Sequence, residues 1–384
     1  MTNAIALLGS TGSIGRQTLE TAELLGISVR SLGAYKNIKL LEDQTRKFKP
    51  DVVAVFDDAA AQDFKASVRD MDVRVVAGID GLVEAACVEG ASTVVTAVVG
   101  TVGLIPTLAA IEQGRTIALA NKETLVCAGS VVMKAAKARG AEIIPVDSEH
   151  SALFQCLKAE KPEYVKKLIL TASGGPFRGW SKGELARVTP EMALRHPNWR
   201  MGEKITIDSA TMMNKGLELI EAAHLFGIPP EKIDIVVHPE SIVHSMVEFN
   251  DNSVIAQLAQ PDMRLPIQYA LTYPERRPSL VDTLDLTKLS SGLTFEPPDF
   301  NAFPCLSLAI EAAKAGGTAP AVMNGANEAA VARFLAGEIG FYGIYESVCA
   351  ALDNIAYIEE PSLEDLIAAD KQAKQFVTES HAAS

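Results

Sequence analysis

A glycine-rich loop close to the start of the chain constrains the fold most. The apolar run Ala4–Leu8 leads directly into GSTGSIG (9–15), and the residues up to about Leu25 have the apolar spacing of an amphipathic helix. Backbone N–H groups at the start of such a helix attract a pyrophosphate, and glycines let it approach closely. Tight turns also need glycine, so the motif alone is weak. Its place between a strand and a helix predicts a dinucleotide-binding α/β domain.

The rest of the first third of the chain repeats this alternation of strand and helix. Short apolar, β-branched runs recur between helical stretches, which predicts βαβ units and a Rossmann-like, mostly parallel sheet. The predicted strands are Ala4–Leu8, Val29–Leu32, Val52–Val55, Val73–Val76, Thr93–Val98, Thr116–Ala120 and Glu142–Val146.

The pattern changes near residue 147, and again near residue 274. Predicted strands at Lys167–Ala172, Ile235–Val237 and Ser253–Gln257 indicate a second α/β domain with a more open, mixed sheet. A stretch rich in Pro, Ser and Asp then predicts a linker, and the helical spacing beyond it predicts a small helical domain. Its expected helices are Cys305–Ala315, Ala319–Leu335 and Tyr342–Ile355. We therefore expect domains at 1–147, 148–274 and 305–384, with a linker at 275–304.

Composition excludes several classes of protein. The formal net charge of −13 argues against nucleic acid as a partner, since phosphate backbones would be repelled. No apolar run reaches the roughly 18 residues of a membrane helix. The five cysteines are odd in number and contain no C-x-x-C pair, which argues against a disulfide framework or a thiolate zinc site. The sequence shows no basic leader segment, so we expect a cytoplasmic protein. Since nucleic acid and membranes are disfavoured as partners, we expect it to act on a small molecule.

The end of the second predicted strand bears on which dinucleotide binds. An NAD site places an acidic residue there to bind the ribose 2′-hydroxyl. This chain instead has Tyr35, Lys36 and Asn37, with no carboxylate and one lysine. A cation suits a 2′-phosphate, so NADPH is favoured. Lys36 could also be a solvated loop residue, and the missing acid therefore carries more weight than the lysine.

Two acidic residues follow the last predicted strand of the first domain. That strand leads into DSEH (147–150), and a helix is expected to begin near Ser151. Alternate residues of an extended stretch face one side, so Asp147 and Glu149 would project together from the carboxyl end of the strand. A divalent cation would remove their repulsion, and oxygen ligands suit Mg²⁺ or Mn²⁺. Both residues could instead cap the helix, and this segment alone leaves the choice open.

A second polar group lies in DSATMMNKGLE (208–218). Asp208 or Ser209 could cap a helix that runs to about Phe226. On that helix Asn214, Lys215 and Glu218 share one face, because residues three and four apart are neighbours. The face could bind a ligand or be a solvated surface with an i,i+3 ion pair. Two loops, SGGPF (173–177) and HPNWRMG (196–202), could bind a phosphate and close over a substrate.

Taken together, these motifs closely resemble those of the 1-deoxy-D-xylulose 5-phosphate reductoisomerase family. The resemblance covers essentially the whole chain and rests on GSTGSIG (9–15), LANKE (119–123), PVDSEH (145–150), SGGPF (173–177), HPNW-M-G (196–202), DSATMMNKGLE (208–218) and HPESIVHSM (238–246). It implies an NADP-dependent oxidoreductase and isomerase of isoprenoid precursor biosynthesis. The implied reaction is a metal-dependent skeletal rearrangement of 1-deoxy-D-xylulose 5-phosphate, followed by hydride delivery from NADPH, giving 2-C-methyl-D-erythritol 4-phosphate. A homodimer is also implied.

The resemblance also implies roles for individual residues. The implied metal ligands are Asp147, Glu149 and Glu218, and the implied catalytic residues are Lys122, Glu149 and His150. Substrate contacts are implied for Lys122, Ser148, Glu149, Ser173, His196, Trp199, Ser209, Asn214, Lys215 and Glu218, with Trp199 as the lid. Cofactor contacts are implied for Thr11, Gly12, Ser13, Ile14, Lys36, Asn37, Asn121, Glu123 and Gly202. The chain departs from the family at Tyr35, where the family often has glycine.

Two other functions fit the residues without the resemblance. A plain NADP-dependent dehydrogenase of a semialdehyde or hydroxy acid would use the carboxylates only as helix caps, and would keep its activity in a chelator. A non-catalytic NADPH sensor would bind the cofactor without turnover, but the expected convergence of Lys, His, Asp and Glu residues on one cleft argues against it.

Overall fold

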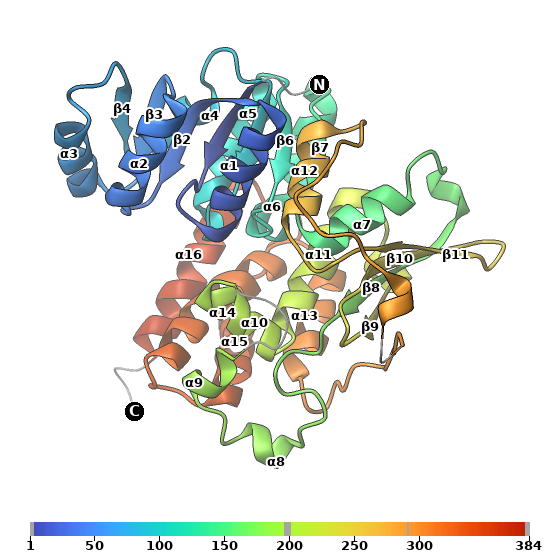
Figure 1. Ribbon diagram of the computed structural model, residues 1–384. Coiled ribbons are helices and arrows are strands. Elements are labelled where there is room, and N and C mark those ends of the chain that lie inside the picture. The colour runs from blue at the N-terminus through green and yellow to red at the C-terminus, as the bar shows by residue number, and fades with distance from the viewer. Residues whose placement is uncertain (1–3, 196–200, 290–291, 381–384) are drawn as a thin grey trace. The chain divides into compact units, whose positions relative to one another are not determined.

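The computed structural model describes residues 4–195, 201–289 and 292–380. The chain forms two compact units (Figure 1). Unit 1 contains Met1–Thr124, Val132–Phe154 and Asp262–Asp282, and unit 2 contains Leu125–Val131, Gln155–Pro261 and Thr283–Ser384. The boundaries of these units differ from the predicted domain boundaries. Residues 262–282 belong to unit 1, and the helices after residue 304 belong to unit 2 together with the central segment of the chain.

Unit 1 is built on a seven-stranded parallel sheet with the strand order β4-β3-β2-β1-β5-β6-β7. The predicted fold class is confirmed. The strand order reverses beside β1, and ligands of open α/β sheets bind at such a switch point. The strands are β1 (Ala4–Leu8), β2 (Ser28–Ala34), β3 (Val52–Val55), β4 (Arg74–Ala77), β5 (Thr93–Thr96), β6 (Thr116–Leu119) and β7 (Ile143–Pro145).

Helices bury the apolar strands of this sheet. They are α1 (Ser13–Leu25), α2 (Ile38–Phe48), α3 (Asp58–Ser67), α4 (Gly78–Ala86), α5 (Leu104–Glu112) and α12 (Arg264–Thr272). Two further helices, α6 (Glu123–Arg139) and α7 (Ser148–Cys156), follow β6 and β7, and part of each belongs to unit 2. All five residues of β1 are buried. Ile267 and Leu271 of α12 join the same core as Ile5 and Leu7, and α12 packs against α1. This packing explains why a segment so late in the chain belongs to unit 1.

Unit 2 contains a four-stranded mixed sheet with the order β11-β10-β8-β9. β8 and β9 are parallel, whereas β10 is antiparallel to both β8 and β11. A mixed sheet was predicted here, although β10 was not among the strands named. The strands are β8 (Val165–Ala172), β9 (Ile233–Val237), β10 (Val243–Phe249) and β11 (Val254–Leu258). β11 is an edge strand.

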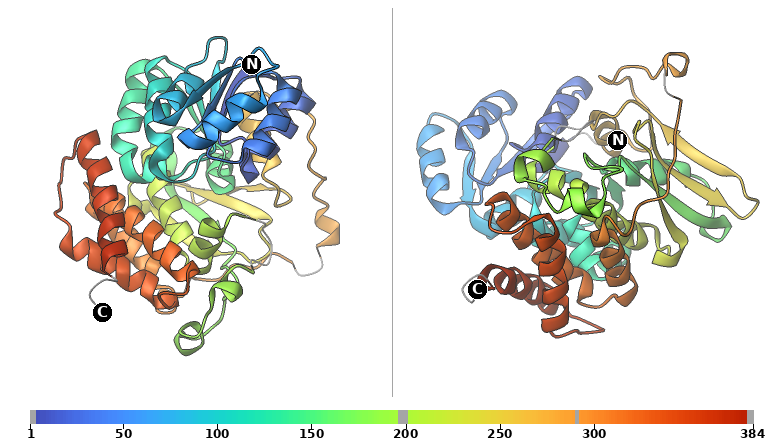
Figure 2. Two further views of the ribbon diagram at one scale, coloured as in Figure 1. Left: turned by 90° about the vertical axis from the view of Figure 1, so that its left-hand side faces the viewer. Right: turned by 90° about the horizontal axis from the view of Figure 1, so that it is seen from below.

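The helices of unit 2 include a bundle in its C-terminal part, shown in orange and red in Figure 2. Helix α14 is buried along most of its length and packs against α13, α15 and α16. The helices are α8 (Lys182–Leu185), α9 (Pro190–Ala193), α10 (Glu203–Ala210), α11 (Met213–Phe226), α13 (Pro304–Ala315), α14 (Ala319–Leu335), α15 (Phe341–Asn354) and α16 (Leu363–Glu379). The predicted helices match α13, α14 and α15 to within one residue at each end, while α16 was not predicted.

Short 3-10 turns complete the secondary structure. They are η1 (Gly100–Gly103), η2 (Pro162–Tyr164), η3 (Pro230–Lys232) and η4 (Leu286–Lys288). Among the described residues of 275–303, η4 is the one helical element, and Glu296 pairs with Val237 of β9. All five cysteines are free, as expected. No helix among the described residues is long and apolar enough to cross a membrane.

Candidate active site

The glycine loop after β1 has no room for side chains at two of its glycines. Gly9 has a φ of +91°, and a Cβ there would lie 2.3 Å from the carbonyl oxygen of Ala97. A Cβ on Gly15 would lie 2.2 Å from the Gly9 oxygen. The N–H groups of Gly9 and Ser10 donate to the Gly33 oxygen at 2.8 and 2.9 Å, which joins the loop to β2. These contacts explain why glycine is needed there.

The first turn of α1 is suited to an anion. Gly12 is the N-cap residue, and no described side chain caps the helix or places an acid in its first turn. The predicted cofactor residues here are exposed or half-buried; they are Thr11, Gly12, Ser13 and Ile14. Backbone N–H groups and the positive end of the helix dipole therefore meet at an accessible position, and a pyrophosphate fits it.

The three residues after β2 are exposed. The Nζ of Lys36 lies 5.6 Å from the ring centroid of Tyr35. The side chain of Asn37 caps α2 by accepting a hydrogen bond from the N–H of Leu40 at 3.4 Å. As the sequence indicates, no carboxylate directly follows β2, and Lys36 is accessible to a ligand.

A buried amide organises the residues after β6. Asn121 is 1 % exposed, and its Nδ2 donates to the carbonyl oxygens of Val98 and Gly100, both at 2.9 Å, and to Glu123 Oε2 at 2.8 Å. Its Oδ1 accepts from the backbone and the hydroxyl of Thr124. The side chain of Asn121 thus holds the β6–α6 turn together and fixes the orientation of Glu123.

Asp147 caps a helix and also contacts a largely buried lysine. Its Oδ1 accepts from the N–H of Glu149 at 3.2 Å, so it caps α7. Its Oδ2 lies 3.1 Å from the Nζ of Lys122, and both side chains are largely buried. His150, fully buried, has its Nδ1 3.7 Å from Asp147 Oδ1. The hydroxyl of Ser148 donates to Glu149 Oε2 at 2.6 Å. Capping therefore does not exclude a ligand role.

The prediction of how Asp147 and Glu149 come together was wrong in its mechanism. Helix α7 begins at Ser148, three residues earlier than expected. Glu149 therefore lies in the first turn of a helix and not on an extended strand. The two carboxylates are neighbours because the first helical turn folds back on its capping residue.

The polar face of α11 is not solvated. Lys215 is 4 % and Glu218 is 1 % exposed, and the two form an ion pair through Glu218 Oε2. The Nδ2 of Asn214 donates to Glu218 Oε1 at 2.6 Å. A buried charged pair needs further hydrogen bonds to offset its desolvation, and Asn214 supplies one. The surface alternative is therefore wrong for Lys215 and Glu218.

Asp208 and Ser209 do not cap this helix, which corrects the prediction. Both lie in α10, and Met212 adopts a left-handed conformation (φ 60°) that separates α10 from α11. Asp208 is instead held by the Nζ of Lys204 at 2.7 Å and by the Nδ2 of Asn327 at 2.8 Å. Ser209 is half-buried at the end of α10.

The loop after β8 packs closely on this segment. The N–H of Gly175 donates to the hydroxyl of Ser173 at 3.2 Å, and a Cβ on Gly175 would lie 2.7 Å from the Ser209 oxygen. The loop that carries Ser173 therefore contacts the end of α10 that carries Ser209, and both serines are predicted to bind substrate. Gly202 is the N-cap of α10. The predicted substrate residues His196 and Trp199 lie outside the described residues.

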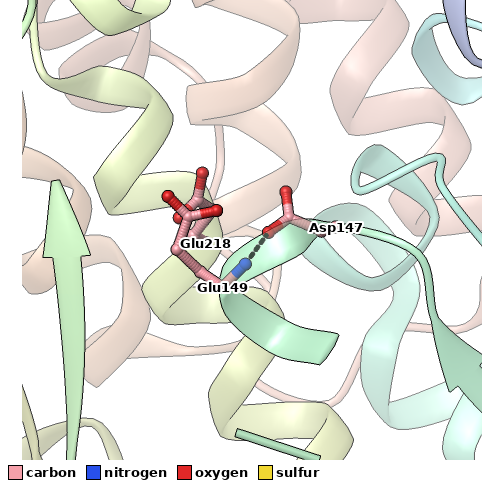
Figure 3. A group of neighbouring side chains, drawn as sticks. All are labelled: Asp147, Glu149 and Glu218. Atoms are coloured by element: carbon pink, nitrogen blue, oxygen red, sulfur yellow. Dashed lines mark hydrogen bonds between the residues drawn. The ribbon is translucent and has the colours of Figure 1, made fainter. Parts of the chain in front are cut away.

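Three carboxylates form one group of potential metal ligands (Figure 3). One oxygen of each of Asp147, Glu149 and Glu218 lies within 4.8 Å of the others. Such a group repels itself unless cations balance it. An all-oxygen donor set suits Mg²⁺ or Mn²⁺ better than softer metals.

Sequence reasoning gave no role to two histidines of the segment 238–246. The Nε2 of His238 accepts from the N–H groups of Ile242 and Val243 at 3.2 and 3.1 Å, and its Nδ1 lies 2.8 Å from the Thr294 oxygen. His238 thus carries its proton on Nδ1 and joins the β9–β10 turn to a distant segment. Burial lowers the pKa of His244 to about 4. Only the apolar neighbours of His244 in the sequence could have indicated its burial.

Three family models together match most of the chain. Residues 5–129 match the model for 1-deoxy-D-xylulose 5-phosphate reductoisomerase, and 143–226 and 258–376 match models of C-terminal domains of the same enzyme. A protein of that name from Acetivibrio thermocellus is 55 % identical over 379 residues, which is 99 % of each chain. The chain belongs to the 1-deoxy-D-xylulose 5-phosphate reductoisomerase family. The predicted family is confirmed.

Solved reductoisomerase structures have the same fold. The Zymomonas mobilis enzyme in complex with NADPH is 46 % identical, with a TM-score of 0.92 and full coverage of both chains. Another reductoisomerase, solved with NADPH, fosmidomycin and magnesium, is 42 % identical with a TM-score of 0.93, and the match covers 98 % of this chain and 97 % of that one. The cofactors expected for this chain, NADPH and a divalent cation, are those that its reductoisomerase relatives bind in these complexes.

Proposed function

We propose that the chain converts 1-deoxy-D-xylulose 5-phosphate to 2-C-methyl-D-erythritol 4-phosphate with NADPH, and that Asp147, Glu149 and Glu218 hold the divalent cation. Membership of the reductoisomerase family supports the reaction. The grouping of three carboxylates supports the metal site, because oxygen ligands and local negative charge are what Mg²⁺ or Mn²⁺ requires. When bound, the cation would polarise substrate oxygens and NADPH would supply the hydride.

The glycine loop and the first turn of α1 fit the pyrophosphate of NADPH. Thr11, Gly12, Ser13 and Ile14 would offer backbone N–H groups and hydroxyls to it. At the two ends of the cofactor, the proposed contacts are Lys36 and Asn37 for the 2′-phosphate and Asn121, Glu123 and Gly202 for the nicotinamide side.

Two lysines are placed to orient the substrate. Lys122 pairs with Asp147 and Lys215 pairs with Glu218, so each ammonium is held beside a proposed metal ligand. There each can donate to a substrate oxygen while the carboxylate keeps it in place. Ser148 would contact the sugar backbone. His150, buried beside Asp147, is proposed to assist proton movement.

The phosphate end of the substrate is assigned to unit 2. Ser173, Ser209, Asn214 and Lys215 supply hydroxyls, an amide and a cation, the groups that bind phosphate monoesters. His196 and Trp199 complete this proposed set, with Trp199 as a lid that excludes water.

The deciding experiment is NADPH oxidation with 1-deoxy-D-xylulose 5-phosphate, in a chelator and after addition of Mn²⁺ or Mg²⁺. We expect no turnover in the chelator and recovery with either metal. A plain dehydrogenase would keep its activity in the chelator, and an NADPH sensor would bind the cofactor without turnover. A folded, NADPH-binding sample with no metal-dependent oxidation would refute the proposal.

We also propose a homodimer in the cytoplasm. Val254, Ile255 and Leu258 of the edge strand β11 are 50 %, 44 % and 36 % exposed, and an exposed apolar edge favours pairing with a second copy. The free cysteines fit a reducing compartment. Light scattering after gel filtration tests the assembly: Val254→Lys should give monomers, and a wild-type monomer would contradict it. Cell fractionation tests the location.

A further inference from the structure

An exposed aromatic ring lies beside the lysine that follows β2. Tyr35 is 57 % exposed, yet two contacts restrict it. Its carbonyl oxygen accepts from the N–H of Asp57 at 3.1 Å, and its ring centroid lies 5.8 Å from that of Phe56. The Nζ of Lys36 lies 5.6 Å from the same ring centroid, within the range of a cation–π contact. The ring is thus a supported surface for the ammonium group.

These residues lie next to the glycine loop. The N–H groups of Gly9 and Ser10 donate to the oxygen of Gly33, which is two residues before Tyr35 at the end of β2 (labelled in Figure 1). A dinucleotide with its pyrophosphate at the start of α1 places its adenosine ribose at the end of the second strand. Tyr35 and Lys36 are therefore at the ribose position, where NADPH carries a 2′-phosphate and NADH a hydroxyl.

The charges around Lys36 leave it available to an anion. Among the described residues, no carboxylate forms an ion pair with it. The nearby carboxylate of Asp57 accepts from the N–H of Ala60 at 2.9 Å and caps α3. The side chain of Asn37 caps α2. A lysine has a flexible stem and loses rotamer freedom when it binds an anion, and a ring that already holds the ammonium reduces this loss.

We propose that Tyr35 is a positioning residue that increases the selectivity of the cofactor site for NADPH over NADH. It holds the Lys36 ammonium where the 2′-phosphate binds. Tyr35 therefore affects the binding only of a dinucleotide that carries this phosphate. The inference rests on the proposed use of NADPH and adds a residue that strengthens this preference.

The test compares dissociation constants of NADPH and NADH, measured by fluorescence titration of the full chain. Tyr35→Leu should weaken NADPH about two- to five-fold, the range of an exposed cation–π contact, and leave NADH unchanged. Tyr35→Phe keeps the ring and should keep the preference. Lys36→Met should weaken NADPH more than about ten-fold. Adding Tyr35→Leu to Lys36→Met should then change nothing further.

A matched control is Tyr164→Leu, because Tyr164 is 47 % exposed and has Lys161 Nζ 5.7 Å from its ring centroid. Tyr164→Leu should alter neither the NADPH nor the NADH dissociation constant. Equal weakening of NADPH and NADH by Tyr35→Leu would overturn the inference, as would no change or an additive effect in the double variant. These results leave the proposed function standing. A folded wild-type chain that binds no NADPH would overturn both the role of Tyr35 and the proposed function.

Discussion

Replacing Glu218 by glutamine tests the proposed metal site most directly. Glu218 is 1 % exposed, accepts from Asn214 at 2.6 Å and pairs with the buried Lys215. Glutamine has the same shape and keeps one oxygen for Asn214. It removes the negative charge, and its amide group would face the ammonium of Lys215.

Two effects of Glu218→Gln can be estimated. Breaking a buried ion pair by removing one partner costs about 3–5 kcal/mol. For a folded unit of this size each kcal/mol lowers the melting temperature by about 2–4 °C, so we expect a decrease of about 6–20 °C. Loss of a residue that only orients a metal ligand costs about 10–100-fold in metal affinity, so loss of a ligand should cost at least about 100-fold.

The assay combines four measurements on one sample: calorimetric unfolding, Mn²⁺ titration, NADPH titration and turnover. Turnover and Mn²⁺ affinity should fall sharply while NADPH affinity stays within about two-fold, since Glu218 is not part of the glycine loop. Glu231→Gln, at an exposed position in η3, is the matched control and should change none of the four measured quantities. Equal losses of Mn²⁺ and NADPH affinity, or unchanged Mn²⁺ affinity, would refute the ligand assignment.

Three further predictions concern other parts of the chain. Gly15→Ala should destabilise unit 1 by more than about 1 kcal/mol and weaken NADPH binding, because its Cβ would lie 2.2 Å from backbone. Gly12→Ala, whose nearest atom is at 3.4 Å, should have a much smaller effect on thermal unfolding; equal effects would contradict the packing argument. Asn327→Ala removes a 2.8 Å hydrogen bond to buried Asp208 and should cost about 1.5–3 kcal/mol in a urea melt. A variant as stable as wild type would show that this bond is unimportant. Burial lowers the pKa of His244 to about 4, so the unfolded chain binds more protons between pH 4 and about 6.5. Stability should therefore fall by up to about 3 kcal/mol as the pH drops through this range. His244→Gln should flatten that decline, and an unchanged pH profile would contradict it.

The fold of unit 1 could be read from the sequence because its signals are local. Each strand is a short apolar run bounded by turn residues, and β1 and β3 were predicted to the residue. The return of α12 to unit 1 could not be predicted in this way. That segment packs on α1 through residues about 250 positions away, and the pattern of a single segment does not identify its distant partner.

The residues that form the site could be predicted from the sequence, but their burial and their contacts could not. Helical spacing correctly placed Lys215 and Glu218 on one face of α11. It could not show that the face is buried, because burial depends on segments distant in the sequence, and α11 packs against α13, β8 and β9. The role of His238 was hidden for a similar reason, since Thr294 is 56 residues away.

The charges of the site indicate why the two lysines accompany the three carboxylates. Asp147 is paired with Lys122 and Glu218 with Lys215, so two of the three carboxylates have a lysine beside them. A divalent cation adds two positive charges to this group, which makes the site more attractive to an anionic sugar phosphate. The same lysines hold the carboxylates in position before the cation arrives, which lowers the rearrangement needed on binding. On this argument metal binding and substrate binding are coupled, and each should strengthen the other by the same factor in paired titrations.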